Sequence, residues 1–252
     1  MGSPLFISEK LSEIAGIHAG DGHLRKNGEE LEISGSFEEK EYYDACVIPL
    51  FNSVFDLKLK GRYFLTKGTY GFRVSNLKIK QTLLELGFPL GKKSDIVRIP
   101  EQILSSRDKT LQVAFLRGLC DTDGSISFDK KMKNSNFFKK YRHFYPRVCF
   151  STTSEILARQ VYSLVKELGF YSCFFTKAAR KPTQNISYDI CLNGKDALLL
   201  WMSSIKPSNQ VKFSRYSVWQ RYGFCPPKTT YEQRQKILKG ELNPNSLYGP
   251  VM

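Results

Sequence analysis

The sequence has no long hydrophobic run. No segment approaches the roughly 20 consecutive apolar residues of a membrane-spanning helix. The first residues, Met1 to Pro4, also lack the basic region and the apolar stretch of a secretory signal. We therefore expect a soluble, intracellular protein with no membrane partner.

The cysteine and histidine patterns of common metal sites are also missing. The six cysteines include no Cys-x-x-Cys pair, which excludes a zinc ribbon or zinc finger. Of the three histidines, His18 and His23 lie close in sequence but have no third ligand nearby, so any bound metal would be a hard ion held by carboxylates. Without a secretory signal, the cysteines are expected to be reduced and mostly buried.

Acidic residues are scarce relative to basic ones. The 252 residues include 38 Lys and Arg but only 24 Asp and Glu, which gives a net charge of +14. Such a surplus favours a polyanionic partner, because each cation that pairs with a phosphate releases a counterion. A basic surface kept for solubility is the alternative. The hydrophobic fraction of 41% is sufficient for a packed core of one large or two small domains.

One motif occurs twice. Residues 14–22 read Ile-Ala-Gly-Ile-His-Ala-Gly-Asp-Gly and residues 116–124 read Leu-Arg-Gly-Leu-Cys-Asp-Thr-Asp-Gly, so Asp21 aligns with Asp123. Each copy precedes two predicted hairpins, each followed by a helix. The segments 70–74 and 188–192 also correspond, and their larger offset places about 16 extra residues in the first hairpin of the second copy. We therefore predict an α+β fold, a pseudo-twofold duplication of an α-β-β-α-β-β-α unit.

Turn residues and caps give the expected bounds of these elements. Asn27-Gly28 predicts a tight turn, Pro49 a bend or a helix end, Asn76 a helix N-cap, and Thr152 with Glu155 a capping box. In the first unit we expect strands over 23–26, 30–34, 57–65 and 70–75 and helices over 38–55 and 77–87. In the second unit we expect strands over 125–128, 147–151, 171–177 and 187–193 and helices over 152–169 and up to 205. The predicted domains are 1–105 and 106–225, and the tail 226–252 is interpreted as a linker with a short helix near 231–238.

Two segments, 57–84 and 130–147, carry basic residues and no acid. In the first segment, Lys58, Lys60 and Arg62 alternate with Leu and Gly, which places all three cations on one face of a strand. Aromatic residues are interleaved in the second segment, as suits a loop that follows a phosphate backbone. A solvated polar face is the alternative, but two basic sheets would form a saddle wide enough for a duplex. The candidate DNA-binding residues are Lys58, Lys60, Arg62, Arg73, Lys130, Lys131, Lys133, Lys139, Lys140, Arg142, Lys177, Arg180 and Lys181.

The two motifs predict a pair of adjacent carboxylates. Small residues, among them Gly16 and Gly118, would let the two motif helices pack closely side by side. Asp21 and Asp123 would then emerge at the same end of the helix pair. Two adjacent carboxylates repel each other unless a cation lies between them, so a shared divalent metal is the expected occupant. A metal that faces a phosphodiester can activate water, polarise phosphoryl oxygens and stabilise a leaving oxygen.

Over about residues 8–222, the sequence resembles the single-chain, two-motif LAGLIDADG homing endonucleases. The resemblance rests on both motif copies and on the connecting segments 87–100 and 115–119. It implies a pseudo-symmetric monomer that needs no protein partner and lays two saddle-shaped sheets in the DNA major groove. It also implies a double-strand break in a long, asymmetric DNA site. The implied cofactor is Mg²⁺, with Mn²⁺ as a substitute and Ca²⁺ supporting binding without cleavage.

The resemblance also implies roles for individual residues. The last Asp of each motif is the metal ligand of the family, which corresponds to Asp21 and Asp123, and Gly20 and Thr122 would supply backbone carbonyls. A basic residue near each scissile phosphate corresponds to Lys93, for which Lys92 is an alternative, and to Lys212. These two lysines and the two aspartates are the expected catalytic set.

The sequence departs from the family pattern at His18, at Ala19, which occupies the place of Asp121, and at Arg117. We expect His18 to be packed or hydrogen-bonded at the helix interface, and Arg117 to point outward or to pair with a carboxylate. Intein splicing residues are missing at both ends, which favours an intron-encoded or free-standing member. The sequence leaves the compartment open, and the resemblance is compatible with an archaeal cytoplasm or an organelle. The alternatives are an intron RNA maturase or another DNA- or RNA-binding protein on the same scaffold, including a regulator that has lost nuclease activity.

Overall fold

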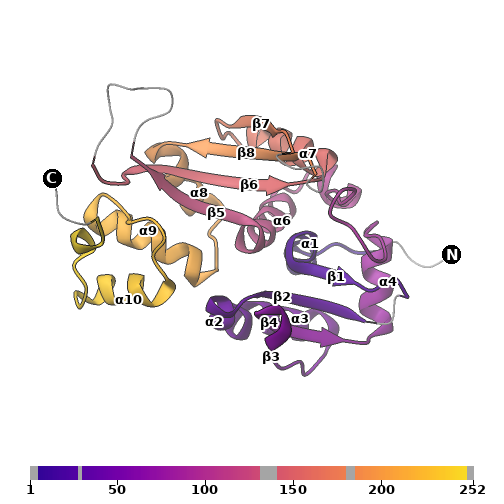
Figure 1. Ribbon diagram of the computed structural model, residues 1–252. Coiled ribbons are helices and arrows are strands. Elements are labelled where there is room, and N and C mark those ends of the chain that lie inside the picture. Colours follow the sequence, from indigo (N-terminus) through magenta and orange to yellow (C-terminus); the bar gives the residue numbers. More distant parts are fainter. Residues whose placement is uncertain (1–4, 28–29, 131–140, 180–184, 249–252) are drawn as a thin grey trace.

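The computed structural model describes residues 5–27, 30–130, 141–179 and 185–248, and these residues form two four-stranded antiparallel sheets (Figure 1). The first sheet has the strand order β1-β2-β4-β3 and the second has the order β5-β6-β8-β7, so equivalent strands of the two repeats occupy equivalent places. This confirms the predicted α+β class and the duplicated topology. The strands are β1 (Gly22–Leu24), β2 (Leu31–Ser36), β3 (Arg62–Phe64), β4 (Thr69–Val74), β5 (Gly124–Asp129), β6 (Tyr145–Thr152), β7 (Cys173–Lys177) and β8 (Ser187–Asn193).

The two motif helices, α1 and α6, lie side by side at the centre of the molecule, between the two sheets (Figure 1). The other helices pack around the sheets or follow them. The helices are α1 (Glu9–Asp21), α2 (Lys40–Tyr42), α3 (Ile48–Phe55), α4 (Leu77–Glu85), α5 (Glu101–Leu104), α6 (Lys109–Thr122), α7 (Glu155–Glu167), α8 (Lys195–Ser204), α9 (Gln210–Tyr222) and α10 (Tyr231–Lys239).

Glycine allows the backbones of α1 and α6 to touch. A Cβ atom on Gly16 would overlap the carbonyl oxygen of Phe115, and a Cβ atom on Gly118 would overlap the carbonyl oxygen of Glu13. The two positions are equivalent in the two motifs, so the same close approach occurs twice across the interface. This places the C-terminal ends of both helices next to each other.

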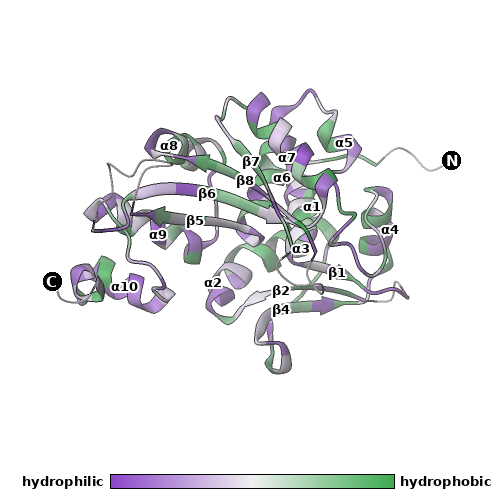
Figure 2. Cartoon of the chain, turned by 45° about the horizontal axis from the view of Figure 1, so that its top comes forward, coloured by the Kyte–Doolittle hydropathy of each residue, from purple (hydrophilic) through white to green (hydrophobic). Residues whose placement is uncertain are grey.

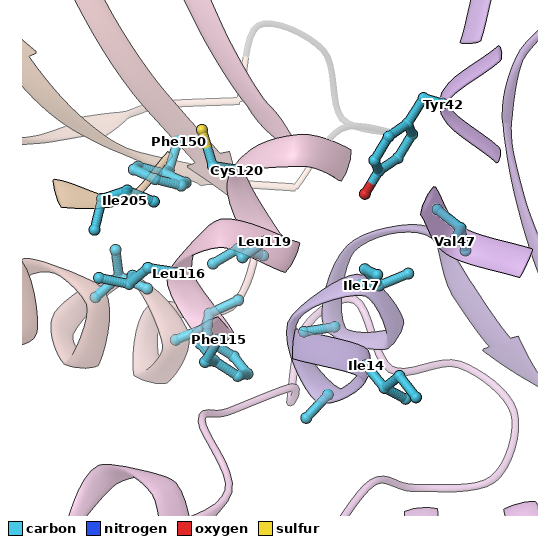
Figure 3. Close-up of a cluster of buried hydrophobic side chains, with 14 of the residues drawn as sticks. Ile14, Ile17, Tyr42, Val47, Phe115, Leu116, Leu119, Cys120, Phe150 and Ile205 are labelled. Carbon is cyan, nitrogen blue, oxygen red and sulfur yellow. The ribbon is translucent and has the colours of Figure 1, made fainter. Parts of the chain in front are cut away.

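Apolar side chains surround this helix pair (Figure 3). Ile14 and Ile17 of α1 and Phe115 and Leu119 of α6 are almost entirely buried. In Figure 2, hydrophobic residues are drawn green on α1 and on two helices that contact it, α3 and α6. The hydrophobic core therefore runs through both repeats and fixes the two sheets relative to the helix pair.

The predicted strand over 57–65 is wrong for its first half. Only Arg62–Phe64 pair with β4, and residues 57–61 form no regular element. The side chain of Asn52 explains the difference, because its Oδ1 accepts from the amide of Leu59 at 2.8 Å and its Nδ2 donates to the carbonyl of Leu59 at 3.3 Å. The side-chain amide thus takes the backbone groups that a neighbouring strand would take. Exposed Lys58 and Lys60 still alternate with half-buried leucines.

The helical stretch predicted over 38–55 is present but irregular. A 3₁₀ turn (Phe37–Glu39) precedes α2, and a π turn (Tyr43–Val47) joins α2 to α3. Pro49 lies in the first turn of α3, where its missing N–H leaves the preceding turn wide. In the second repeat, α7 is capped by Ser154, whose Oγ accepts from the amide of Leu157 at 3.2 Å, so the predicted cap at Thr152 is wrong by two residues.

Residues 226–248 pack against the body of the protein and do not form a linker. Its helix α10, close to the predicted short helix, lies beside α9 (Figure 1). The guanidinium of Arg234 is fully buried between them and donates to Ser214 Oγ at 2.7 Å and to the carbonyl of Val211 at 3.1 Å. Tyr231 also reaches the first repeat, where its hydroxyl donates to Glu41 at 3.1 Å.

Two cysteines differ from the expectation of reduced thiols. Cys149 of β6 and Cys191 of β8 lie directly opposite each other, with their Cα atoms 4.3 Å apart, and form a disulfide. Antiparallel pairing brings together two residues that are 42 positions apart in the sequence. Their spacing alone does not indicate this register.

Candidate active site

The motif aspartates lie together at the adjoining ends of the helix pair. Asp21 is the last residue of α1, and Asp123 caps α6. A Cβ atom built on Gly20 would lie 3.3 Å from the carboxyl carbon of Asp123 and would overlap the hydroxyl of Thr122. The residues before the two aspartates therefore touch across the helix interface.

Desolvation by the surrounding protein affects both carboxylates, although Asp21 is half-buried and Asp123 is exposed. The pKa of Asp21 is raised to about 7, chiefly by desolvation and also by the charges of Asp123 and Glu39, while a 2.6 Å hydrogen bond from the hydroxyl of Tyr43 opposes the shift. Desolvation also raises the pKa of Asp123, against the attraction of Lys93 and the second lysine, Lys212. A site that concentrates negative charge in this way favours a bound cation.

Each motif helix has a lysine at its end. Lys93 Nζ donates to the carbonyls of Ala19 at 2.6 Å and Gly20 at 2.8 Å. Lys212 Nζ donates to the carbonyl of Cys120 at 3.0 Å and to that of Thr122. The two lysines therefore hold equivalent places in the two repeats.

Lys93 and its sequence neighbour differ in surroundings. Burial lowers the pKa of Lys93, while the charges of Asp123 and Asp21 oppose that shift. Lys92 instead forms an exposed ion pair with Asp95 at 2.6 Å. Of the two alternatives left open by the sequence, Lys93 is the one that contacts the motif.

Two separate pockets lie at the site, and each contains one of the lysines. The first, of about 310 Å³, is lined by Gly20, Lys93 and Asp123 together with hydroxyl side chains of β6 and of the segment that follows it. The second, of about 340 Å³, is lined by Lys212, Arg215 and residues of β5, and it reaches the second motif at Gly124, the residue after Asp123. Each lysine therefore has its own pocket.

Three polar residues of the site were not recognised as site residues in the sequence. Asp121 is fully buried and accepts from the amides of Ser208 and Asn209 at 2.8 and 3.1 Å. Asn209 Nδ2 donates to Glu39 Oε1 at 2.8 Å, which connects the second motif to the first repeat. The sequence offers one signal for Asn209. Ser208 and Asn209 are residue types that commonly cap the start of a helix, but the sequence analysis assigned no helix to the residues that follow them.

Acidic residues from neighbouring strands lie beside the basic residues that were predicted to bind DNA. Glu32 lies beside Arg73 in the sheet register and pairs with Arg73 at 2.8 Å and with Lys67 at 2.7 Å. In the second repeat, Asp189 forms an ion pair with Lys177. The neighbouring strands supply these acids, so the expectation of nearly acid-free faces is wrong at these positions.

Other predicted DNA-binding residues differ in their surroundings. Lys58, Lys60 and Arg62 are exposed. Lys130 lies over the ring of Tyr141, and the guanidinium of Arg142 lies 4.8 Å from the ring centroid of Phe224. Lys131, Lys133, Lys139, Lys140, Arg180 and Lys181 lie outside the described residues.

The structure also places two of the departures from the family pattern. His18 is fully buried and meets the ring of Phe88 edge-on at 4.6 Å, and among the described residues neither ring nitrogen has a hydrogen-bond partner. Burial lowers the pKa of His18 well below its usual value. Arg117 pairs with Glu13 at 3.0 Å, which confirms the expected carboxylate partner.

The described part of the chain contains no group of three or more His, Cys, Asp or Glu residues that could hold a metal ion. A cation here would therefore rely on the two carboxylates, backbone carbonyls and groups from outside the protein. No helix in the described residues is long and apolar enough to cross a membrane.

Comparison with known proteins links the second repeat to a described family. Residues 110–205 match the model of a LAGLIDADG-like domain. The replication factor C small subunit of Methanocaldococcus jannaschii is 26% identical over 209 residues, which cover 82% of this chain and 10% of that protein. The chain thus spans about a tenth of the length of this curated relative.

Solved structures share the fold of the whole chain. The I-LtrWI LAGLIDADG homing endonuclease bound to target DNA is 15% identical, with a TM-score of 0.54 and coverage of 85% of this chain and 89% of that one. I-SmaMI bound to uncleaved DNA in the presence of calcium ions is 12% identical, with a TM-score of 0.50 and coverage of 97% and 98%. The N-terminal LAGLIDADG domain of DUF199/WhiA is 13% identical, with a TM-score of 0.50 and coverage of 81% and 93%. Residues 110–205 are therefore a LAGLIDADG-like domain, and the whole chain has the two-repeat fold of the single-chain LAGLIDADG homing endonucleases.

Proposed function

We propose that this chain is a sequence-specific DNA endonuclease that makes a metal-dependent double-strand break in a long, asymmetric site. One observation carries the proposal: each repeat contributes one carboxylate to the adjoining helix ends, and each end has a lysine that lies in its own pocket. Two lysine pockets beside one pair of carboxylates suit two scissile phosphates on opposite strands. The net charge of +14 supports a DNA partner.

The carboxylates of Asp21 and Asp123 fit a hard divalent cation, and we propose Mg²⁺. Both are oxygen donors, and desolvation and their mutual repulsion disfavour the charged form when no cation is bound. The carbonyls of Gly20 and Thr122 accept a lysine proton each, which leaves a second lone pair on each oxygen. When bound, such a metal would activate water and polarise phosphoryl oxygens.

The other residues of the site bind and orient the phosphodiester in this proposal. Lys93 and Lys212 would each stabilise developing charge on one scissile phosphate, since each lies in its own pocket. The exposed cations Lys58, Lys60 and Arg62 would contact the backbone and base edges. The division into domains 1–105, 106–225 and 226–252, the monomeric state and a role in intron homing belong to the same proposal.

Cleavage selection from a randomised DNA library, with Mg²⁺, Ca²⁺ and no added metal compared, tests this function. We expect cleavage with Mg²⁺ and binding without cleavage with Ca²⁺. Asp21→Asn and Asp123→Asn should each lower the cleavage rate by at least about a hundred-fold while binding in Ca²⁺ is retained. Asp196→Asn, at an exposed position of α8, is the matched control and should cut normally.

The same experiment separates the proposal from a protein that only binds nucleic acid. The fold also occurs in the DUF199/WhiA domain, so the fold alone does not distinguish cleavage from binding. Tight DNA binding without cleavage under every metal condition would favour a regulator. Preferential binding of structured RNA, again without cleavage, would favour the maturase alternative.

A further inference from the structure

Asn209 uses all its polar groups at the junction of the two repeats. It is fully buried and precedes α9, where its Oδ1 accepts from the amide of Val211 at 3.0 Å. Its backbone N–H donates to Asp121 Oδ1 at 3.1 Å. Its side-chain Nδ2 donates to the carbonyl of Asp121 at 2.7 Å and to Glu39 Oε1 at 2.8 Å. One side chain therefore holds the end of α6, the start of α9 and the first repeat.

This arrangement sets the position of Lys212. Lys212 lies in the first turn of α9, three residues after Asn209, and its ammonium reaches the carbonyls of Cys120 and Thr122. Asn209 takes the carbonyl between them, that of Asp121. Three consecutive carbonyls at the end of α6 are thus bound by two side chains of α9, and a shift of α9 along α6 would break all of these bonds together.

The lysine of the first repeat is held differently. Lys93 lies in an irregular segment, and the residue three positions before it is Leu90, which has no side-chain amide to donate. The residues after Lys93 are held from the second repeat, where Thr153 Oγ1 donates to the carbonyl of Ser94 at 2.9 Å. The two lysines are therefore held by different contacts.

We propose that Asn209 is a positioning residue for Lys212 alone, so that it controls cleavage of one DNA strand and not of the other. The proposal rests on the proposed endonuclease function and names a residue that acts through the lysine. Loss of the Nδ2 bonds would free the start of α9, and a displacement of about 1 Å at a reacting group can cost on the order of a hundred-fold in rate.

The test uses the full-length protein and a duplex whose two strands carry different end labels. Lys93→Met and Lys212→Met first identify the strand that depends on each lysine. Asn209→Ser keeps a capping oxygen but removes the amide donor. We expect it to slow the strand that depends on Lys212 by roughly ten- to a hundred-fold and to leave the other strand within about two-fold of wild type.

Three controls distinguish positioning from general damage. The ratio of the two strand rates in one sample does not depend on how much of the protein is folded, and the isosteric Asn209→Asp gives a second measurement if the serine variant folds poorly. Asn76→Ser makes the same change at the N-cap of α4 and should leave both rates unchanged. The double variant Asn209→Ser/Lys212→Met should be no slower than Lys212→Met alone.

Two results would overturn the proposal. Equal slowing of both strands would mean that Asn209 supports the fold in general, and unchanged rates would mean that α9 is held without it.

A wild-type protein that cuts neither strand in any metal would overturn the proposed function and this inference with it. A wild-type protein that cuts both strands, with an unaltered strand ratio in the Asn209 variants, would overturn this inference alone.

Discussion

The buried His18 makes a specific contribution to the pH dependence of folding. Burial lowers its pKa well below the usual value, and the charges of Lys93 and His23 lower it further. The ring is fully enclosed against Phe88, and its nitrogens have no hydrogen-bond partner within the described residues. Protonation in the folded state would therefore bury an uncompensated charge.

The sign and size of the effect follow from this depressed pKa. An unfolded histidine binds a proton near pH 6.5, whereas the folded one does not. The stability that neutral His18 contributes is therefore fully present above about pH 6.5 and is lost as the pH falls toward the folded pKa. At about 1.4 kcal/mol per pH unit, the loss between pH 7.5 and pH 5.0 is at most about 2 kcal/mol, the value for a ring that stays neutral throughout in the folded state.

Urea denaturation of wild type and His18→Leu at both pH values measures this term. Burial raises the pKa of Asp21 and Asp121, which stabilises the fold as the pH falls, so the wild-type profile alone combines opposite trends. We expect the stability of His18→Leu relative to wild type to increase by up to about 2 kcal/mol from pH 7.5 to pH 5.0. His23→Leu, at an exposed position, should show no such change. Parallel profiles of His18→Leu and wild type would refute the reasoning.

Two further predictions use pairs of similar residues as internal controls. Tyr43→Phe should lower the free energy of unfolding by about 1–3 kcal/mol, because it removes the hydroxyl that donates to half-buried Asp21, whereas Tyr42→Phe removes a buried hydroxyl without a partner in the described residues and should cost little. Urea denaturation measures both, and equal losses would contradict the importance of the carboxylate bond. Arg62→Ala should reduce the salt dependence of DNA binding by about one counterion, and Arg73→Ala by less, because Arg73 already pairs with a carboxylate of the neighbouring strand. Binding titrations over a range of salt concentrations would show the opposite order if that ion pair opens on DNA.

Local patterns in the sequence predict the architecture well. The two motifs mark equivalent helices, and the period-2 alternation in β5 and β8 places Ile126, Phe128 and Leu192 on the buried side of the second sheet. Because the repeat fixes the order of elements, one hairpin interpreted correctly supports its counterpart. The shared strand order of the two sheets confirms this reasoning.

Competition from side chains limits the same reasoning at the edges. Leu57 to Gly61 have the alternation of a strand, but Asn52, outside the segment, takes the backbone groups of Leu59. The register of β2 against β4 could not be predicted either, because nothing in the sequence shows that Glu32 lies beside Arg73. These features depend on residues that approach only after the sheet has formed.

The supporting residues of the candidate site form the least predictable part for a related reason. Asp121, Asn209 and Glu39 are linked by hydrogen bonds that span 88 and 170 positions of the sequence. Each residue has a local role: Asp121 belongs to the motif, Asn209 caps α9 and Glu39 completes a capping box. None of these local roles predicts a contact with the other two residues. Because all three lie where the helix pair meets α9, their connection follows from the close packing that Gly16 and Gly118 permit. The arrangement of the lysine pockets therefore depends on glycines that contact neither lysine.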